Sequence, residues 1–323
     1  MKSVLVSIVT YNSSTTIAGC LESLQAQTCR DFLVVIADNA SADDTIEKIQ
    51  RFEAEVLKNR SNLGFCVAHN QVIERFPSDY ILVLNPDLQL APAFLEQLLS
   101  GIGRNEAIGT ACGKLLRLRN GERTSIVDCA GMVLRPNQRH LDRGAGEIDH
   151  GQYDAPGFVF GATGAAVLYR RTFLEDVRQS TGFFDSNFFA FREDADLSWR
   201  GQWLGWKCLY WPAAVGWHKR RVTPERRRRL PPEINYHSVK NRFLMRIKNL
   251  DGKNYARHFA SITLRDIAVA GYTLLLEWSS LPAFAFVARH YRKYRILRRE
   301  LMQRRRATPN QVGEWFMKEI ELL

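Results

Sequence analysis

The sequence predicts an α/β fold with a mostly parallel sheet flanked by helices. Over the first hundred residues, short apolar, β-branched segments that end in polar turn residues alternate with helix-like segments. Parallel strands need such helical crossovers, because each crossover returns the chain to the same end of the sheet. With 323 residues, 46% of them hydrophobic, the chain can bury the core that this architecture requires.

The expected strands of this first half span residues 4–10, 32–38 and 80–85. In open parallel sheets, ligands bind outside the carboxyl ends of the strands. Residues 10–12, 38–39 and 85–87 should therefore surround one crevice. Later segments are less regular, and we expect loops and short strands over 113–160, a strand over 161–170, a helix over 193–203 and a strand over 206–211.

Charge is distributed unevenly along the chain. Residues 1–218 hold 21 Lys/Arg and 25 Asp/Glu, whereas residues 219–323 hold 24 and 9. The basic last third, expected to be helical from about residue 234, indicates an anionic surface as a partner. We predict two domains, residues 1–221 (divided at 112) and residues 222–323, with an Arg- and Pro-rich hinge at 222–232.

The cysteines and the start of the chain favour a cytoplasmic location. The six cysteines form no CxxC pair and no other metal-ligand spacing, so free thiols are expected. The first twelve residues do not have the pattern of a signal peptide.

Polar residues follow the first two expected strands. Thr10, Tyr11 and Asn12 could stack on a base and bond to its edge, or could simply cap the strand before a helix. Asp38 and Asn39 could bind a base or a ribose hydroxyl, as acidic residues do after the second strand of other nucleotide folds. An Asx turn with a helix N-cap explains the same residues, and such a turn can also position Asp38.

Two further loops carry candidates for ligand contact. Asn62, Gly64 and Phe65 lie where a loop enters a helix, and Gly64 permits the backbone to approach a ligand closely. Asn85 and Asp87 lie at the exit of a buried strand, where a carboxylate could hold a divalent cation that neutralises a diphosphate. An ordinary proline turn is the alternative for this triplet.

The densest group of acids lies at the start of an expected helix. Glu193, Asp194 and Asp196 repel one another, which raises at least one pKa and suits the group to general base catalysis. Phenylalanines between residues 184 and 191 could exclude water and stack on a sugar face. The helix dipole alone would also explain acids in a first turn. His218, which follows an expected strand, is either structural or a ligand.

Taken in order, these motifs resemble those of glycosyltransferase family 2, with its nucleotide-binding GT-A fold, and more narrowly its bacterial rhamnosyltransferase-type members. The matching segments are residues 9–12, 38–41, 62–65, 84–87, 161–164, and 184–185 leading to 193–197. Each motif is weak alone, but six in the right order over about three quarters of the chain are specific.

The resemblance implies inverting transfer of a sugar, with rhamnose as a family-level choice, from a dTDP- or UDP-sugar to an acceptor hydroxyl. It implies that Asp194 is the general base and that Asp87, with His218, binds Mg²⁺ or Mn²⁺ at the diphosphate. The implied substrate-binding residues are Thr10, Tyr11, Asn12, Asp38, Asn39, Asn62, Gly64, Phe65, Asn85, Asp87, Gly164, Glu193 and Asp196. Residues 1–112 would bind the donor and residues 113–221 the acceptor.

Asn85 departs from the pattern of many relatives, which have two acids around the metal. Because an amide offers at best a neutral oxygen, the metal would depend on the bound diphosphate.

The C-terminal region indicates contact with a membrane. Residues 267–288 are mostly apolar, but a spanning helix would bury Glu277 at high cost, and Pro282 would divide it. An interfacial or shallow re-entrant hairpin fits better, because residues 289–306 contain nine Lys/Arg and one Glu, and such segments bind anionic headgroups. The alternative is a helical subdomain packed on the core with a solvated basic face. Nucleic acid is not expected as a partner, since no nucleic-acid-binding motif accompanies the charge.

The predicted function is therefore that of a cytoplasmic enzyme, peripheral on the inner face of the membrane, that adds a sugar to a lipid-linked or polysaccharide acceptor. A polyprenyl phosphate acceptor is the alternative, for which Arg192 or Arg200 could supply cations near Asp194. A non-catalytic nucleotide-sugar-binding or scaffold protein is the alternative from another class, and the presence of both Asp87 and Asp194 speaks against it.

Overall fold

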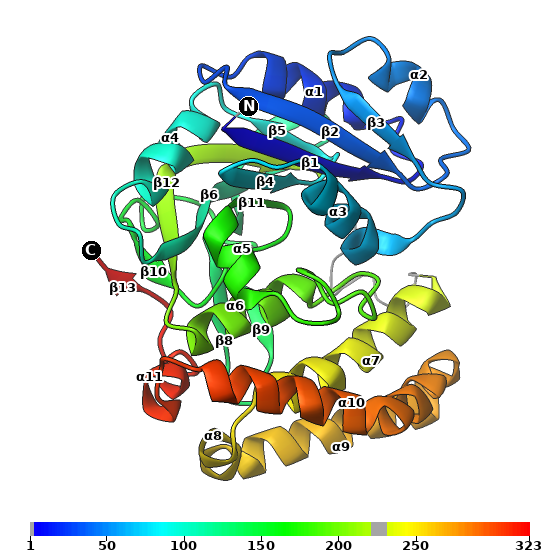
Figure 1. The fold of residues 1–323 in the computed structure, drawn as a ribbon, viewed down its shortest axis with the longest axis vertical. Helices are drawn as coiled ribbons and strands as arrows, with labels where there is room; N and C mark the ends of the chain where they lie inside the picture. The colour runs from blue at the N-terminus through cyan, green and yellow to red at the C-terminus, as the bar shows by residue number, and fades with distance from the viewer. Residues whose placement is uncertain (1–2, 221–230) are drawn as a thin grey trace.

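A central sheet with helices packed against it forms the upper body of the molecule in Figure 1, and a layer of C-terminal helices lies below it. The computed structural model describes residues 3–220 and 231–323. The predicted domain boundary at 221–222 and nearly all of the predicted hinge lie outside these residues.

The first half of the sheet is parallel, with the strand order β3-β2-β1-β4. Its strands are β1 (Val4–Thr10), β2 (Phe32–Asp38), β3 (Glu55–Lys58) and β4 (Tyr80–Leu84), and its helices are α1 (Ile17–Gln25), α2 (Thr45–Ile49) and α3 (Gly64–Arg75). The apolar residues of β1, β2 and β4 are buried, which is why unbroken hydrophobic runs predicted them correctly.

The second half of the sheet is mixed. From β4 outward, β11 and β6 follow in antiparallel order, β12 runs parallel to β6, and β10 and β13 are again antiparallel. The elements of this half are β5 (Leu88–Leu90), α4 (Phe94–Ile102), β6 (Ile108–Arg119), β7 (Glu122–Cys129), β10 (Gly157–Val159), β11 (Ala166–Arg170), α5 (Arg171–Val177), α6 (Glu193–Trp203), β12 (Lys207–His218) and β13 (Glu321–Leu322). A separate two-stranded sheet pairs β8 (Met132–Leu134) with β9 (His140–Asp142).

The predicted α/β architecture is confirmed, with differences in this second half. The segment expected to be loops and short strands contains most of the twelve-residue β6 and all of the eight-residue β7. The strand expected over 161–170 begins only at Ala166, and the strand expected to end at 211 continues to His218. All six cysteines are free, as expected.

The C-terminal helices pack against the rest of the chain. They are α7 (Pro232–Asn249), α8 (Gly252–Arg257), α9 (Phe259–Leu276), the 3₁₀ helix η2 (Trp278–Ser280), α10 (Pro282–Arg304) and α11 (Pro309–Glu314). The apolar segment is broken over residues 277–281, and Pro282 stands in the first turn of α10, as the sequence predicted. Leu244 of α7 and Leu297 of α10 belong to the same buried core as Trp199 of α6, so the C-terminal helices share a core with the rest of the chain.

A buried ion cluster connects α7 to α6. Lys248 Nζ lies 2.8 Å from both Asp185 Oδ2 and Asp196 Oδ2, and Arg200 Nε lies 3.0 Å from Asp196 Oδ2. All four side chains are fully buried. Two cations thus compensate two carboxylates inside the core, as burial of charge requires.

Candidate active site

The carboxyl ends of β1, β2 and β4 meet at one edge of the sheet. The parallel register places Thr10 beside Asp38, and the Asn39 amide donates to the Thr10 carbonyl over 2.8 Å. On the other side of β1, Ile8 lies beside Leu84, so the polar segment after β4 follows directly. The structure therefore brings the three predicted polar segments together, as the ligand rule for open sheets implies.

Asp38 is held by its own neighbours. Its Oδ1 accepts from Thr10 Oγ1 at 2.8 Å and from Ser41 Oγ at 2.6 Å, and its Oδ2 accepts from the Ser41 amide at 3.0 Å. In this Asx-type arrangement Asp38 is only 3% exposed. Asp38 therefore shapes the loop, as expected if these residues form an Asx turn. Tyr11 is 50% exposed and remains available for stacking.

Asn39, Asn62 and Gly64 form a second bonded group. Asn39 Nδ2 donates to Asn62 Oδ1 and to the Gly64 carbonyl, each over 3.2 Å. Gly64 has φ +76°, and a Cβ there would lie 2.5 Å from a ring carbon of Phe189. In the structure, the close approach that requires glycine is to Phe189.

Asp87 and His218 meet because β5 pairs with β12. His218 lies opposite Leu88 in that pairing, and His218 Nε2 lies 3.2 Å from Asp87 Oδ1. On its other side, His218 Nδ1 lies 2.7 Å from Asp128 Oδ2, a buried residue of β7. Burial alone would lower the pKa of the imidazole, but its hydrogen bonds to Asp128 and Asp87 raise the pKa to about 9.

This pair has features that suit a divalent cation. Apart from its contact with His218, Asp87 Oδ1 is buried without a hydrogen-bond partner among the described residues, and the Asp128–His218 contact is the kind that orients a ligating imidazole. Neighbouring ligands of an octahedral cation with bonds of about 2.1 Å lie about 3 Å apart, close to the observed separation. Within the described chain, no three His, Cys, Asp or Glu side chains gather to hold an ion.

Asp194 lies in the first turn of α6, facing the loop before β11. Its Oδ2 accepts from the Gly164 amide at 3.0 Å and its Oδ1 accepts from the Ala195 amide at 2.7 Å. Burial raises the pKa of the Asp194 carboxyl, although both amides favour its charged form. The Asn85 amide donates to the Ala165 carbonyl over 2.8 Å. The loop before β11, whose Gly164 amide binds Asp194, therefore adjoins the loop that carries Asp87.

Two more predicted residues adjoin Gly164. A Cβ on Gly164 would lie 3.2 Å from Phe65 Cζ and 3.8 Å from Glu193 Oε1, so only glycine leaves these contacts undisturbed. Glu193 is buried, and burial together with the Asp194 charge holds its pKa well above the usual range. Asp194 is less buried than Glu193.

Asp196 does not belong to this edge. Its carboxylate is fully buried and is bound by Arg200, Lys248 and the amide of Asn249. Arg200, the other suggested cation, also donates to the Phe183 carbonyl over 2.7 Å. The predicted ligand contacts of Asp196 and Arg200 are therefore wrong, because both side chains lie in the core. Arg192 remains the candidate cation near Asp194.

The segment before α6 is strained and is held by α7. Phe189, Phe191 and Arg192 have φ between 64° and 69°, which costs on the order of 1 kcal/mol each for side chains of this size. Asn241 Nδ2 lies 2.8 Å from the carbonyls of Phe188, Ala190 and Phe191. No local sequence pattern indicates this contact, because Asn241 lies about fifty residues away along the chain.

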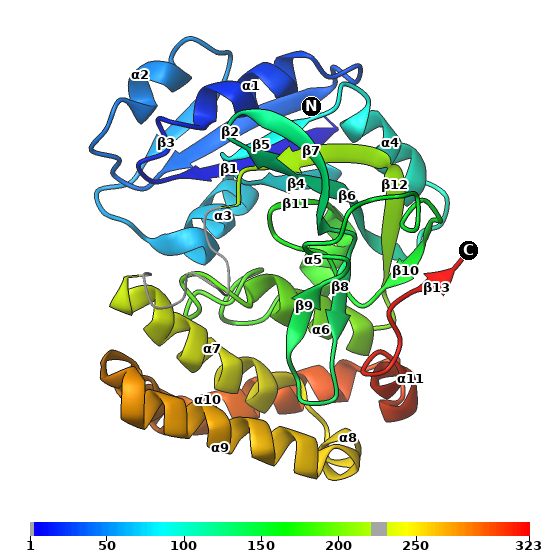
Figure 2. The same cartoon turned by 180° about the vertical axis from the view of Figure 1, so that it is seen from behind.

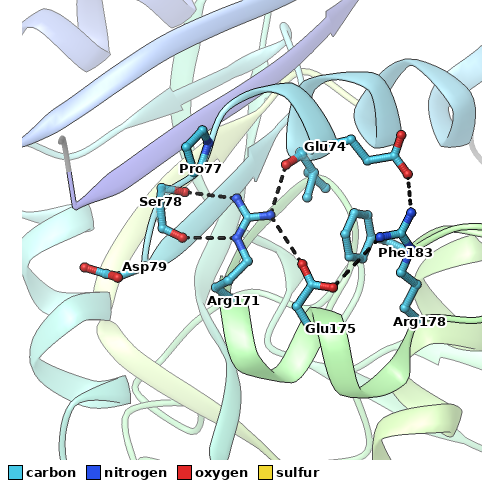
Figure 3. A pocket seen from close by; sticks show the side chains of 9 residues that line it. Glu74, Pro77, Ser78, Asp79, Arg171, Glu175, Arg178 and Phe183 are labelled. Atoms are coloured by element: carbon cyan, nitrogen blue, oxygen red, sulfur yellow. Dashed lines mark hydrogen bonds and ion pairs between the residues drawn. The ribbon is translucent and has the colours of Figure 1, made fainter.

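The hollow shown in Figure 3, with a volume of about 530 Å³, lies elsewhere. It is next to the amino end of β4, where Arg171 donates to the backbone carbonyls of Ile73, Phe76 and Ser78. This guanidinium is therefore engaged with the backbone of the chain.

Fold and site together define a nucleotide-sugar transferase of the GT-A type. Residues 5–178, more than half of the chain, match the family described as Glycosyl transferase family 2. The chain belongs to this family and is a glycosyltransferase, which confirms the resemblance found in its motifs.

One sequence relative and two solved structures illustrate the likeness. N-acetylglucosaminyl-diphospho-decaprenol L-rhamnosyltransferase of Mycobacterium tuberculosis is 29% identical over 232 residues, which are 65% of this chain and 74% of the relative. TarS 1-349 of S. aureus aligns with TM-score 0.56 and 15% identity over 94% of this chain and 90% of its own. GalNAc-T7 with UDP, GalNAc and Mn²⁺ aligns with TM-score 0.61 and 16% identity over 80% and 51%. The two solved structures show a shared fold.

Replacing Asn241 by Ala should lower kcat for sugar transfer roughly 10- to 100-fold, because a base displaced by even 1 Å loses much of its effect. Steady-state kinetics and a melting curve of the same preparation test this. Asn254→Ala is the matched control, since Asn254 is also buried and donates to Asp251 and to the Pro309 carbonyl, away from α6. Equal kcat in the two variants would contradict a positioning role for Asn241.

Proposed function

We propose that this chain transfers a sugar, with inversion, from a nucleoside-diphosphate donor to a hydroxyl group of a lipid-linked acceptor. The observation that carries the proposal is the position of Asp194, whose carboxylate is fixed by two backbone amides beside the loop that holds Asp87. L-Rhamnose is the sugar to test first, because the M. tuberculosis relative is named as an L-rhamnosyltransferase.

The donor is proposed to occupy the edge formed by the ends of β1, β2 and β4. The exposed ring of Tyr11 would stack on the base, and the loop that Asp38 organises would bind the nucleoside. Asp87 and His218 would hold Mg²⁺ or Mn²⁺, which neutralises the charge of the departing diphosphate. Asn85 lies on the same loop as Asp87, and its side-chain amide oxygen would be a neutral ligand for the metal.

Asp194 is the proposed general base. The acceptor hydroxyl gives its proton to the Asp194 carboxylate as its oxygen bonds to the anomeric carbon, and the bond to the donor diphosphate breaks on the opposite face. Burial suits this role, because a carboxyl group with a raised pKa is a stronger base near neutral pH. The two amide hydrogen bonds fix the direction from which Asp194 approaches.

Contact with the inner face of the membrane is proposed through α9 and α10. By length and composition α9 could cross a bilayer, with a mean hydropathy of 1.4. Only Ile262 and Thr273 of this helix are buried in the protein, so most of its apolar surface is left for a membrane. Asp266, midway along α9, lies 2.5 Å from Arg246 of α7, which favours a helix lying in the interface. Exposed apolar side chains of α9 and η2 are Phe259, Leu264, Ile267, Leu274, Leu275, Leu276 and Trp278.

The charge of α10 specifies the kind of membrane. Arg289, Arg292, Lys293, Arg295 and Arg299 are exposed along it. Basic side chains beside an apolar helix face favour a bilayer with anionic headgroups. The apolar helix α9 and the basic side chains of α10 would thus supply the two contributions to membrane binding, which are burial of apolar surface and attraction to anionic headgroups.

Replacing Asp194 by Asn should lower transfer by about 10²–10⁴-fold and leave nucleotide binding nearly unchanged, because the amide cannot accept the proton. Transfer assays with dTDP-rhamnose and calorimetry with dTDP and UDP measure the two effects. Asp79→Asn, at the opposite end of β4, is the control. A variant that kept more than about a tenth of the wild-type rate would rule out Asp194 as the base.

Replacing Asp87 by Ala should remove the effect of Mn²⁺ on nucleotide binding. Calorimetry with UDP and dTDP, in Mn²⁺ and in EDTA, should show tighter binding in Mn²⁺ for the unmodified protein and no difference for the variant. If Mn²⁺ strengthens binding equally in both proteins, Asp87 does not hold the metal.

Replacing Leu264, Ile267 and Leu275 by Ser should weaken binding to vesicles containing phosphatidylglycerol at least tenfold, because each buried leucine contributes about 1.5–3 kcal/mol. Co-sedimentation measures this binding. Ser at Ile148, Met317 and Leu322, which are equally exposed elsewhere, is the control. Unchanged binding of the α9 variant would contradict membrane contact through this helix.

A further inference from the structure

Four arginines from four separate segments surround His140 of β9. They are Arg139, Arg192 before α6, Arg220 after β12 and Arg242 of α7. Figure 2 shows how the β8–β9 hairpin descends beside α6 and α7 and so brings these segments together. Arg192 Nη1 lies 3.1 Å from His140 Nδ1. Burial, and then the charges of the four arginines, hold the pKa of His140 well below its usual range, so the imidazole is neutral.

The positive charge of this cluster is only partly compensated. Arg220 is paired with Asp142 and with Asp128. The side chain of Arg139, by contrast, has no hydrogen-bond or ion-pair partner within residues 3–220 and 231–323. Arg139 therefore contributes a charge and free donors that could bind an anion.

Arg242 supports the same conclusion from α7. It is 4% exposed, and its Nε has no hydrogen-bond partner among the described residues. Asp266, the nearest carboxylate, lies 3.7 Å from Arg242 Nε and is bonded more closely to Arg246. A buried guanidinium with an unsatisfied donor is costly unless a ligand completes its hydrogen bonds.

The cluster lies between the proposed base and the proposed membrane surface. Arg192 is two residues before Asp194, and the charge of Asp142 acts on Asp194. On the other side, Asp266 connects Arg242 and Arg246 to α9. A ligand with a hydroxyl at Asp194 and an apolar chain at α9 would place its middle portion against the arginines.

We propose that Arg139, Arg192 and Arg242 bind the phosphate or diphosphate group that joins the acceptor sugar to its lipid. The planar guanidinium binds phosphate oxygens in pairs, which makes arginine more selective than a point charge for this group. This inference rests on the proposed function, because it names the chemistry of the acceptor for the same Asp194 site.

The test compares two soluble acceptors that differ only in the anionic link. One is an N-acetylglucosaminyl diphosphate with a short alkyl chain, and the other is the alkyl N-acetylglucosaminide without phosphate. Arg139→Gln should raise KM for the diphosphate acceptor about 10- to 100-fold. KM for the donor and for the phosphate-free acceptor should remain unchanged. Arg135→Gln is the matched control, because Arg135 lies at the end of β8 in the same hairpin but is exposed and paired with Glu319.

Three outcomes would overturn the proposal. An equal rise in KM for both acceptors would assign the arginines a structural role, and a rise in KM for the donor alone would place them at the donor diphosphate. Weaker binding to phosphatidylglycerol vesicles with no change in either acceptor KM would assign them to bilayer headgroups. Arg139→Gln suits this test because the Arg139 side chain makes no hydrogen bond or ion pair among the described residues. The melting temperature of the variant checks that it is folded.

A binding experiment separates this inference from the proposed function. Calorimetry with a short alkyl diphosphate, without donor, should show binding that Arg139→Gln weakens and Arg135→Gln does not. If that pattern appears while no sugar transfer is detected with any acceptor, the anion site stands and the proposed function fails. If the unmodified protein does not bind the alkyl diphosphate, the anion site fails whatever the transfer assay shows.

Discussion

The contact between Lys248 and two buried carboxylates is the interaction on which the rest of the structure depends. Lys248 Nζ lies between Asp185 and Asp196, and none of the three side chains is exposed. Burial alone would raise the pKa of Asp185, but Lys248 and Asn187 lower it to about 2, so this carboxylate is charged in the folded protein. Such a cluster is tolerated only when every charge has its partner, which fixes α7 against α6 in one arrangement.

That arrangement makes α7 part of the proposed catalytic unit. On the same helix, Asn241 holds the strained segment that leads into α6, and His237 stacks on Phe189 with ring centroids 4.7 Å apart. Strain of this kind persists only where the surroundings determine the conformation. The direction of Asp194 therefore depends on a helix that, in the sequence, belongs to the basic C-terminal region.

The two faces of the start of α6 have opposite roles. Residues two apart on a helix point about 200° away from each other, so Asp194 faces the sheet edge while Asp196 faces the core. The charges around Asp194 are likewise divided. The acids Asp87 and Asp128 gather around His218 on the proposed donor side, and the arginines gather around His140 on the proposed acceptor side. A site divided in this way can bind a cation-bridged diphosphate on one side and a bare anion on the other.

The sequence by itself determined the parallel strands, the order of the motifs and the break at Pro282, because hydrophobic runs, turn residues and proline act locally. It also singled out Asp87, Asp194 and His218 as candidates, each of which lies next to the end or beginning of an element. Only the tertiary structure decided that Asp196 and Arg200 are buried, that Gly64 packs on Phe189, and that Asp128 contacts His218, Asn241 holds the segment before α6 and arginines surround His140. These roles depend on contacts between residues far apart in the chain. The packing of the C-terminal helices, the pairing of β5 with β12 and the pairing of β7 with β6 create these contacts.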